Sequence, residues 1–176
     1  RGPGYNTIVG AGINGTVLHY TANKEPLAPD DLIVIDSGAN YGGYTADVTR
    51  TIPANGKFGP RQREIYELVL KALEASIRVA TVGATMAQID KASRDIIAKA
   101  GHGDRFFHGI GHHLGLEVHD ITPEGPLKEG AVITIEPGIY LEDEKLGVRI
   151  EDDVLITEDG YKSLTNFPKE LMVLPC

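Results

Sequence analysis

The chain of 176 residues has an apolar content of 41% and a formal net charge of −8, which is typical of one soluble globular domain with a sizeable core. The acidic balance argues against a nucleic-acid surface, which needs basic patches, and no apolar run approaches the roughly 20 residues that cross a bilayer. The only cysteine, Cys176, cannot form an internal disulfide, so we expect a cytoplasmic protein without nucleic-acid or membrane partners.

Short strands separated by glycine-rich turns are predicted for the first third of the chain. Residues 4–20 read as short strands broken by glycines, and the apolar run "LIVID" at residues 32–36 predicts a buried strand. The stretch "NYGG" at residues 40–43 predicts a hairpin turn, because its glycines permit positive φ values. The alternating residues beyond it predict a partner strand that ends near Pro53.

Two helices are predicted for the middle of the chain. The first begins at Pro60, which suits a first helical turn. Its apolar residues fall at helical spacing: Ile65, Leu68, Val69, Ala72, Leu73 and Ile77. The second follows Thr85, which forms a capping box with Gln88, and stops at Gly101. Its predicted apolar stripe comprises Ile89, Ala92, Ile96 and Ala100.

The last third of the chain returns to strands. Residues 131–141 and 147–157 predict two strands joined by a polar turn, and a short final segment follows at residues 166–176. The order of strands, two helices and strands predicts an α+β fold in which helices cover one face of an antiparallel sheet. No linker or low-complexity tract divides the chain, so we expect one domain over residues 1–176.

Two acidic residues flank the first predicted turn. With a two-residue turn at Tyr41-Gly42, Asp36 lies directly opposite Asp47, and their Cβ atoms are ~4.5–5.5 Å apart on one face of the hairpin. Like charges in that arrangement are destabilising, and a buried unpaired carboxylate is costly. Strand alternation puts Arg50 on the other face, so a metal cation is the sharper candidate for the neutralising charge.

A second acidic pair flanks the turn between the last two predicted strands. A turn centred on Asp143-Glu144 places Glu136 opposite Glu151. Four carboxylates in one site repel one another, and two divalent cations would neutralise them. The glycine-rich stretch "FFHGIGHHLGLEVHD" at residues 106–120 supplies imidazoles, and oxygen ligands with one or two imidazoles favour Mn²⁺, Co²⁺, Fe²⁺ or Zn²⁺. Spacing alone also permits solvated strand-end carboxylates and structural histidines, because register can slip.

Five separated motifs resemble those of the pita-bread metallopeptidases, the M24-type family. They are "LHYT", "IDSGANYGGYTADVTRT", "HGIGHHLGLEVHD", "TIEPGIY" and "GVRIEDDVLIT", and the resemblance runs from about Tyr5 to Thr165. Within that family the chain is most similar to the catalytic domain of Xaa-Pro aminopeptidase (aminopeptidase P), with prolidase as a near relative. The resemblance implies the pita-bread fold, in which helices cover an antiparallel sheet.

The resemblance also implies a centre of two divalent metal ions, usually assayed with Mn²⁺. The five ligand positions of the family correspond to Asp36, Asp47, His112, Glu136 and Glu151. Its other active-site histidines correspond to His19, His108 and His119, and its supporting positions near the centre to Tyr5 and Arg149. Among these residues, Glu136 is expected to act as general base as well as ligand, and His119 is expected to donate to the developing oxyanion.

The activity that the resemblance implies is hydrolysis of the Xaa-Pro bond at the N-terminus of peptides by a hydroxide that two metals bridge. Two alternatives stay open: a prolidase, which cleaves only Xaa-Pro dipeptides, and an inactive pita-bread module that binds peptides. Relatives carry a longer catalytic domain and usually a separate N-terminal domain, so we expect a fold truncated on its N-terminal side. The expected partners are peptides with proline in second position, and either a second copy of the chain or the absent N-terminal part.

Overall fold

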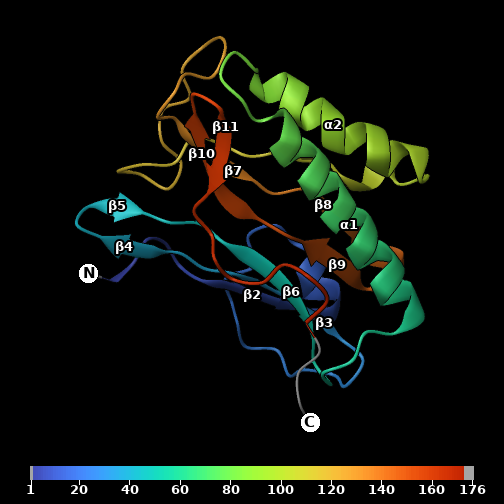
Figure 1. Ribbon diagram of the computed structural model, residues 1–176. Helices are drawn as coiled ribbons and strands as arrows, with labels where there is room; N and C mark the ends of the chain where they lie inside the picture. The colour runs from blue at the N-terminus through green and yellow to red at the C-terminus, as the bar shows by residue number, and fades with distance from the viewer. Residues whose placement is uncertain (1, 173–176) are drawn as a thin grey trace.

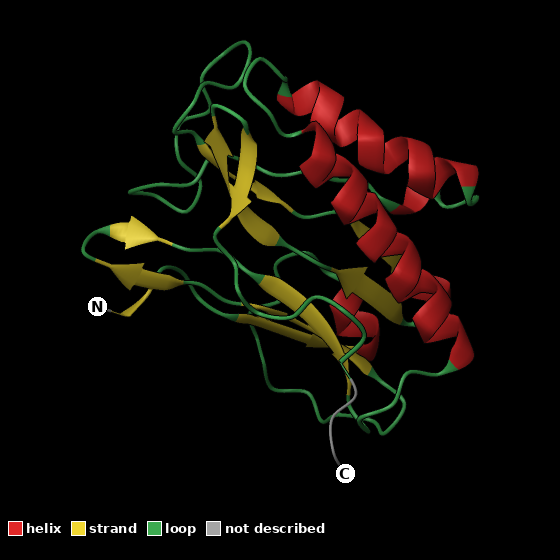
Figure 2. Ribbon diagram, viewed as in Figure 1, coloured by secondary structure: helices red, strands yellow, loops and turns green. Residues whose placement is uncertain are grey.

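Helices and strands form separate layers in the computed structural model, which describes residues 2–172 (Figure 1). Helix α1 (Pro60–Val79) packs against strands of the second half of the chain, and helix α2 (Met86–Lys99) packs against α1. The strand pairs are antiparallel. This arrangement confirms the predicted α+β fold with helices on one side of antiparallel strands (Figure 2). Cys176 and the end of the predicted final segment lie outside the described residues.

Both helices carry the end signals that their sequences predicted. Pro60 occupies the first turn of α1. The hydroxyl of Thr85 accepts a hydrogen bond from the backbone N–H of Gln88, and the Gln88 side chain accepts one from the backbone N–H of Thr85. Gly101 follows α2 with a φ of +86°, a value that favours glycine.

The buried faces of the two helices agree with the predictions to different degrees. Every predicted core position of α1 is buried except Leu68, which is half-buried. In α2 the fully buried residues are Ile89, Ser93 and Ile97, so the predicted stripe is correct at Ile89, only half-buried at Ala92 and Ile96, and wrong at Ala100, which is exposed. The physical reason is polar: the Ser93 hydroxyl pairs with that of Ser76 on α1 at 2.6 Å, which turns this side of α2 toward its neighbour.

The first half of the chain forms two small sheets. Its strands are β1 (Gly2–Pro3), β2 (Ile8–Ala11), β3 (Leu32–Asp36), β4 (Ala39–Tyr41), β5 (Tyr44–Thr45) and β6 (Thr49–Pro53). Strand β3 lies between β2 and β6 in one sheet, and β4 lies between β1 and β5 in the other. After β2, where more strand was expected, residues 12–16 form a short 3₁₀ helix.

The second half of the chain forms a long hairpin whose two arms are each divided. The strands of the hairpin are β7 (Val132–Ile135), β8 (Gly138–Leu141), β9 (Leu146–Arg149) and β10 (Asp152–Thr157), and β11 (Gly160–Ser163) pairs with the other edge of β10. Strand β8 pairs with β9, and β7 with β10, in one shared register. The arms were predicted as single strands, but Pro137 has no N–H for the ladder. The gap holds Glu136 and Glu151 at matching positions, as the predicted turn required.

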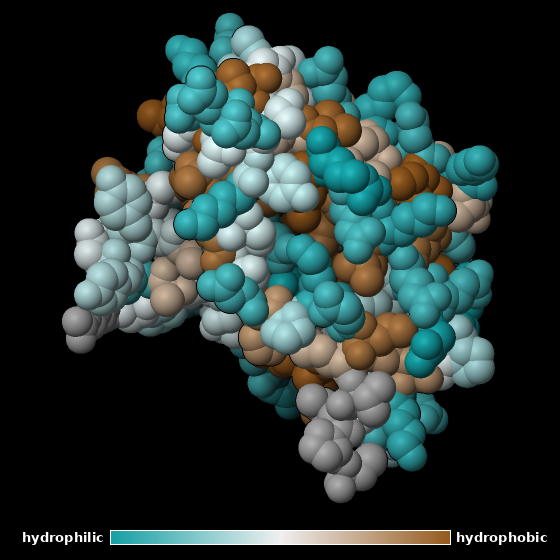
Figure 3. Space-filling model, viewed as in Figure 1, coloured by the Kyte–Doolittle hydropathy of each residue, from teal (hydrophilic) through white to brown (hydrophobic). Residues whose placement is uncertain are grey.

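The core lies mainly between α1 and the strands of the second half. Its bulkiest fully buried side chains include Tyr66, Phe106 and Tyr140. On the face shown in Figure 3, hydrophilic side chains are spread over the helices, and the hairpin of β4 and β5 projects from the body. Within residues 2–172, neither helix combines the length and the apolar character that a membrane span needs.

Candidate metal centre

One open cavity collects the five side chains that were predicted to be metal ligands. Its wall includes Asp36, Asp47, His112, Glu136 and Glu151. Four more of the predicted site residues line the same cavity: His19, His108, His119 and Arg149. Tyr5, the last of the set, lines an adjoining pocket that shares Asp36 and Asp47 with the first. The fold therefore gathers in one place the residues that the sequence had singled out from separate segments.

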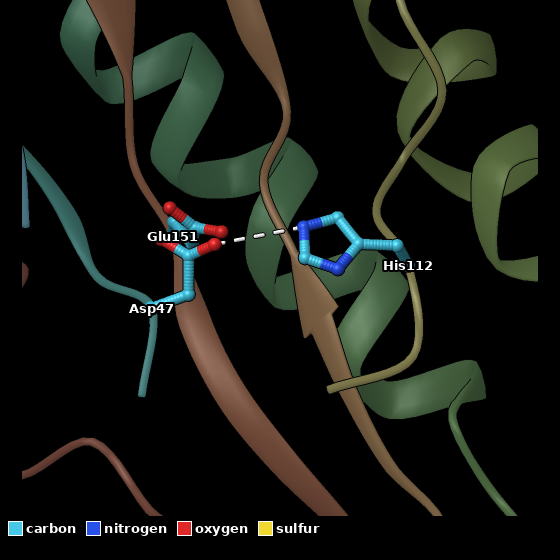
Figure 4. Close-up of side chains that lie close together, drawn as sticks. All are labelled: Asp47, His112 and Glu151. Carbon is cyan, nitrogen blue, oxygen red and sulfur yellow. Dashed lines mark ion pairs between the residues drawn. The ribbon is translucent and has the colours of Figure 1, made fainter. Parts of the chain in front are cut away.

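Asp47, His112 and Glu151 form a close group within this cavity (Figure 4). One ligand atom from each lies within 4.8 Å of the others. The His112 Nε2 atom is 3.6 Å from Asp47 Oδ2 and 3.5 Å from Glu136 Oε1. Since these side chains come from three separate segments and point toward one another, they could share a cation.

The predicted register of the first acidic pair is wrong. The turn falls at Gly42-Gly43, where both residues have positive φ, rather than at Tyr41-Gly42. Asp36 therefore pairs with Thr49 instead of Asp47. Asp47 lies two residues before Thr49, so it keeps its side chain on the same face as Asp36. The two carboxylates are diagonal neighbours, and the shared face survives the shift.

The chain itself compensates the charge of this first pair. Arg149, whose side chain is 3% exposed, donates from Nη2 to Asp36 Oδ2 at 2.8 Å. The Tyr5 hydroxyl lies within hydrogen-bonding reach of a carboxylate oxygen of both Asp36 and Asp47. Burial raises the pKa of Asp36 in spite of Arg149. Burial acts in the same direction on Asp47, but hydrogen bonds from His112 and Tyr5 outweigh it and lower the pKa of that carboxyl.

Arg50 serves the opposite face, as strand alternation predicted. Its Nη2 pairs with Asp152 Oδ1 at 2.6 Å, and its Nη1 donates to the carbonyl oxygens of Thr49 and Glu151. This guanidinium therefore fastens β6 to the segment that follows β9. It supports the backbone of the site, whereas the carboxylate of Asp36 in the cavity is paired with Arg149 instead.

Hydroxyl groups hold the second acidic pair. Thr134 Oγ1 donates to Glu136 Oε1 at 3.3 Å, and Thr49 Oγ1 donates to Glu151 Oε2 at 2.7 Å. The other oxygen of Glu151 is buried and has no hydrogen-bond partner within the described part of the chain. Burial raises the pKa of Glu136 to about 7 and raises the pKa of Glu151 well above its ordinary value.

The donor atoms fit divalent metal ions. An unpartnered carboxylate oxygen in a buried position is costly, and a cation beside Glu151 would satisfy it. Four carboxylates with one imidazole are a ligand set that suits Mn²⁺, Co²⁺, Fe²⁺ or Zn²⁺. The residues present therefore agree with the group that the sequence predicted.

His112 is oriented by its own backbone surroundings. Its Nδ1 lies 3.0 Å from the carbonyl oxygen of His113, which leaves Nε2 for the carboxylates. The backbone N–H of His112 donates to Thr134 Oγ1 at 3.1 Å. A Cβ at the preceding Gly111 would lie 2.1 Å from the Thr134 carbonyl oxygen, so only glycine permits this approach. Burial disfavours the imidazolium of His112, but the neighbouring Asp47 carboxylate prevails and raises the pKa.

Three other histidines border the cavity in different surroundings. The ring of His119 lies perpendicular to that of His112, with centroids 4.3 Å apart, and both His119 and His19 are exposed. His108 is half-buried, and its Nε2 lies 2.9 Å from the Tyr140 hydroxyl. Burial lowers the pKa of His108 to about 4, so this imidazole is neutral at neutral pH.

Three residues of the site were not predicted from the sequence. They are Thr49, Thr134 and Tyr140. Strand alternation was a usable signal for the threonines, because each lies two residues from a predicted ligand on the same face. Tyr140 offered a weaker signal, a polar-tipped residue inside an apolar run. Its buried hydroxyl accepts from Arg149 Nη1 at 3.2 Å.

Comparison with known proteins gives agreement over most of the chain. Residues 1–158 match the profile of metallopeptidase family M24. The chain is similar to Xaa-Pro aminopeptidase of Escherichia coli (strain K12), with 41% identity over 94% of this chain and 44% of that protein. It is similar to Xaa-Pro dipeptidase of Pyrococcus furiosus, with 46% identity over 97% of this chain and 50% of that protein. The chain thus spans about half the length of the curated relatives it matches.

Solved structures support the same relationship. Zinc-substituted E. coli aminopeptidase P in complex with product matches with a TM-score of 0.88 and 41% identity, over 94% of this chain and 45% of that one. The same protein with the inhibitor Pro-Leu gives equal values. The expected pita-bread fold is therefore confirmed.

Proposed function

This chain belongs to metallopeptidase family M24, and we propose that its site hydrolyses the bond between an N-terminal residue and a following proline. The observation that carries the proposal is the convergence of four carboxylates and one imidazole in a single cavity that three further histidines border. The relatives named above act, by name, on Xaa-Pro substrates. Because the chain spans about half of their length, substrate and activity are inferred from the site.

We propose that two divalent ions bind in this cavity, with Mn²⁺ as the first choice and Co²⁺, Zn²⁺ or Fe²⁺ as alternatives. The residues that would hold them are Asp36, Asp47, His112, Glu136 and Glu151. When bound, such ions act as Lewis acids and lower the pKa of water, which provides a nucleophile at neutral pH. Arg149 and Tyr5 would keep Asp36 and Asp47 in place, as outer contacts of ligands commonly do.

Glu136 is the proposed general base. Its carboxylate lies at the gap between β7 and β8, where burial brings its pKa to about 7. A base with a pKa near the working pH transfers protons most efficiently. Glu136 would accept a proton from the attacking water and pass it to the nitrogen of the departing proline. One side chain would then carry out both proton transfers and return to its starting state.

The bordering histidines are proposed to contact the substrate. His119 is exposed next to His112 and would donate a hydrogen bond to the carbonyl oxygen as negative charge develops on it. His19 would face the scissile amide. His108 is neutral and half-buried, and would form part of the wall that accepts the proline ring.

Prolidase is the second candidate function, favoured by the 46% identity with the P. furiosus dipeptidase. The tripeptide Ala-Pro-Ala separates the two activities. Release of alanine from it, with Mn²⁺ present, would support an aminopeptidase and exclude a strict dipeptidase. Cleavage of Ala-Pro alone would support prolidase.

A third outcome would remove the enzymatic proposal. If Mn²⁺, Co²⁺ and Zn²⁺ all bind but neither peptide is cleaved, even after addition of the N-terminal part of a full-length relative, the enzymatic proposal fails and the alternative of an inactive module is favoured. Elemental analysis before and after dialysis against a chelator gives the number of ions. Fewer than one ion per chain in the metal-loaded protein, before treatment with the chelator, would contradict the metal centre itself.

A further inference from the structure

Arg94 of helix α2 binds the chain at the start of the histidine-rich stretch. Its Nη1 and Nη2 donate to the carbonyl oxygens of Phe106 and His108 at 2.8 and 2.6 Å. Its guanidinium carbon lies 4.4 Å from the centroid of the Phe106 ring. Asp90, one helical turn earlier, accepts from Arg94 Nε. A planar guanidinium can make these contacts together, whereas a lysine ammonium cannot.

The same contacts continue to the imidazole of His108. Phe106 is 1% exposed, and its ring packs nearly perpendicular to that of His108, with centroids 4.9 Å apart. Arg94, the Phe106 ring and the His108 ring therefore form one continuous series of contacts, in which the two rings meet edge to face. On its other side, His108 is held through Tyr140, which accepts from Arg149 Nη1.

The hydrogen-bond partners of the two ring nitrogens of His108 are consistent with one tautomer. The Nδ1 atom lies 2.8 Å from the carbonyl oxygen of Gly109, which can only accept, so Nδ1 carries the proton. The Nε2 atom then accepts from the Tyr140 hydroxyl at 2.9 Å. Since the protein engages both ring nitrogens, His108 offers carbon surface to the cavity. Such a surface suits an apolar ring better than a polar group.

We propose that Arg94 is a positioning residue, which holds the loop of His108 so that this imidazole forms a fixed wall for the proline ring of the substrate. The inference rests on the proposed function, because it takes the cavity to be the peptide site. Arg94 does not itself line the cavity. Its loss is therefore expected to weaken substrate binding and to leave metal binding intact.

Steady-state kinetics on two variants of α2 test this role. Arg94→Met removes the contacts described above. Lys91→Met is the matched control, because Lys91 forms an exposed ion pair with Asp95 on the same helix, also four residues apart. With Ala-Pro-Ala, Arg94→Met is expected to raise KM about tenfold, the effect of one hydrogen bond to a charged group. Its kcat and metal content should stay near the wild-type values, and Lys91→Met should change none of these quantities.

The ¹⁵N shifts of the His108 ring give a readout that does not depend on turnover. In Zn²⁺-loaded wild-type protein we expect one tautomer, protonated at Nδ1, and in Arg94→Met an average of two tautomers. Arg94→Lys, which can restore one of the two carbonyl contacts, should fall between them. If Arg94→Met does not fold, Arg94→Lys and Asp90→Asn provide the same comparison.

Two results would decide against the role or separate it from the proposed function. Arg94 is only a structural contact if Arg94→Met lowers the melting temperature but leaves both the His108 shifts and KM at wild-type values, and the proposal is then overturned. If the wild-type protein cleaves no Xaa-Pro peptide, the proposed function fails. The shifts of His108 still decide in that case whether Arg94 positions its ring.

Discussion

The two acidic pairs of the site are neutralised in different ways. Asp36 and Asp47 share the Tyr5 hydroxyl, and Asp36 forms an ion pair with Arg149. In the second pair, Thr134 and Thr49 provide only hydroxyl groups to the carboxylates, and one buried oxygen of Glu151 has no partner in the described chain. The first pair is thus stabilised from within the protein, whereas the second is the part of the site that most requires a cation.

The difference also separates two tasks. A carboxylate that an arginine holds in place through an ion pair is a fixed ligand. A carboxylate whose pKa burial raises to about 7, as for Glu136, can exchange a proton near neutral pH. The first pair is therefore suited to holding metal, and the second pair is suited to holding metal and moving protons. Five predictions test this comparison.

Catalysis should depend most strongly on the second pair. Glu136→Gln keeps the size of the side chain but removes the base, so we expect kcat for Ala-Pro-Ala to fall by about 10³-fold. Glu142→Gln, at an exposed position beyond β8, is the control and should leave kcat unchanged. Circular dichroism should show the same fold in both variants. A Glu136→Gln rate near that of wild type would assign the proton transfer to another group.

The free energy of unfolding should depend most strongly on Arg149, the positively charged partner of the first acidic pair. Arg149→Met leaves the Asp36 carboxylate buried without its partner, which should cost about 3–5 kcal/mol in the free energy of unfolding. Arg61→Met breaks the half-exposed ion pair with Glu144 and should cost about 0–1 kcal/mol. Urea unfolding of both metal-free variants measures the contrast. Equal losses would show that Arg149 does not compensate a buried charge.

The pH dependence of stability should reveal the second pair. The folded pKa of Glu136 is about 7 against an ordinary 4.5, and that of Glu151 is also raised, so the folded metal-free protein binds these protons more tightly than the unfolded chain. The stabilisation of the folded state by these bound protons is fully present below about pH 4.5 and is lost as the pH rises through about 7. Melting temperatures with a chelator should therefore fall between pH 5.5 and pH 8.

Metal should reverse this trend. Zn²⁺ at a hundredfold excess over Kd adds about 3 kcal/mol, and the gain in melting temperature should be larger at pH 8, where protons no longer compete for the carboxylates. A metal-free protein whose melting temperature rises from pH 5.5 to pH 8 would contradict the raised pKa values of the second pair.

The smallest expected effect is a change in the free energy of unfolding whose sign should differ between the two acidic pairs. Glu151→Gln removes a buried carboxyl group whose charged form burial disfavours and which lacks a cation, so the metal-free protein at pH 8 should gain about 1 kcal/mol. Asp36→Asn removes the partner of Arg149 and should destabilise the same protein. Thermal unfolding with a chelator measures both changes. Destabilisation by both substitutions to a similar extent would mean that the second pair is as well compensated as the first.

Local rules predicted much of the fold and of the site. The proline at the start of α1, the capping box of α2 and the turn of the second hairpin act over a few residues, so the sequence shows them directly. The predicted register of the first hairpin was wrong because the turn was placed at Tyr41-Gly42, whereas it lies at Gly42-Gly43. A two-residue turn favours positive φ at both central positions, and two glycines adopt it at less cost than a tyrosine.

The sequence alone determined the two helices, the hairpins and the residues whose chemistry suits a cation site, because period, caps and turns depend on near neighbours. Tertiary structure decided which charges meet. Arg149 reaches Asp36 across 113 positions, Tyr5 enters between two carboxylates, and Arg94 holds a loop from another layer. Such contacts depend on how distant segments pack, and no local pattern specifies that packing.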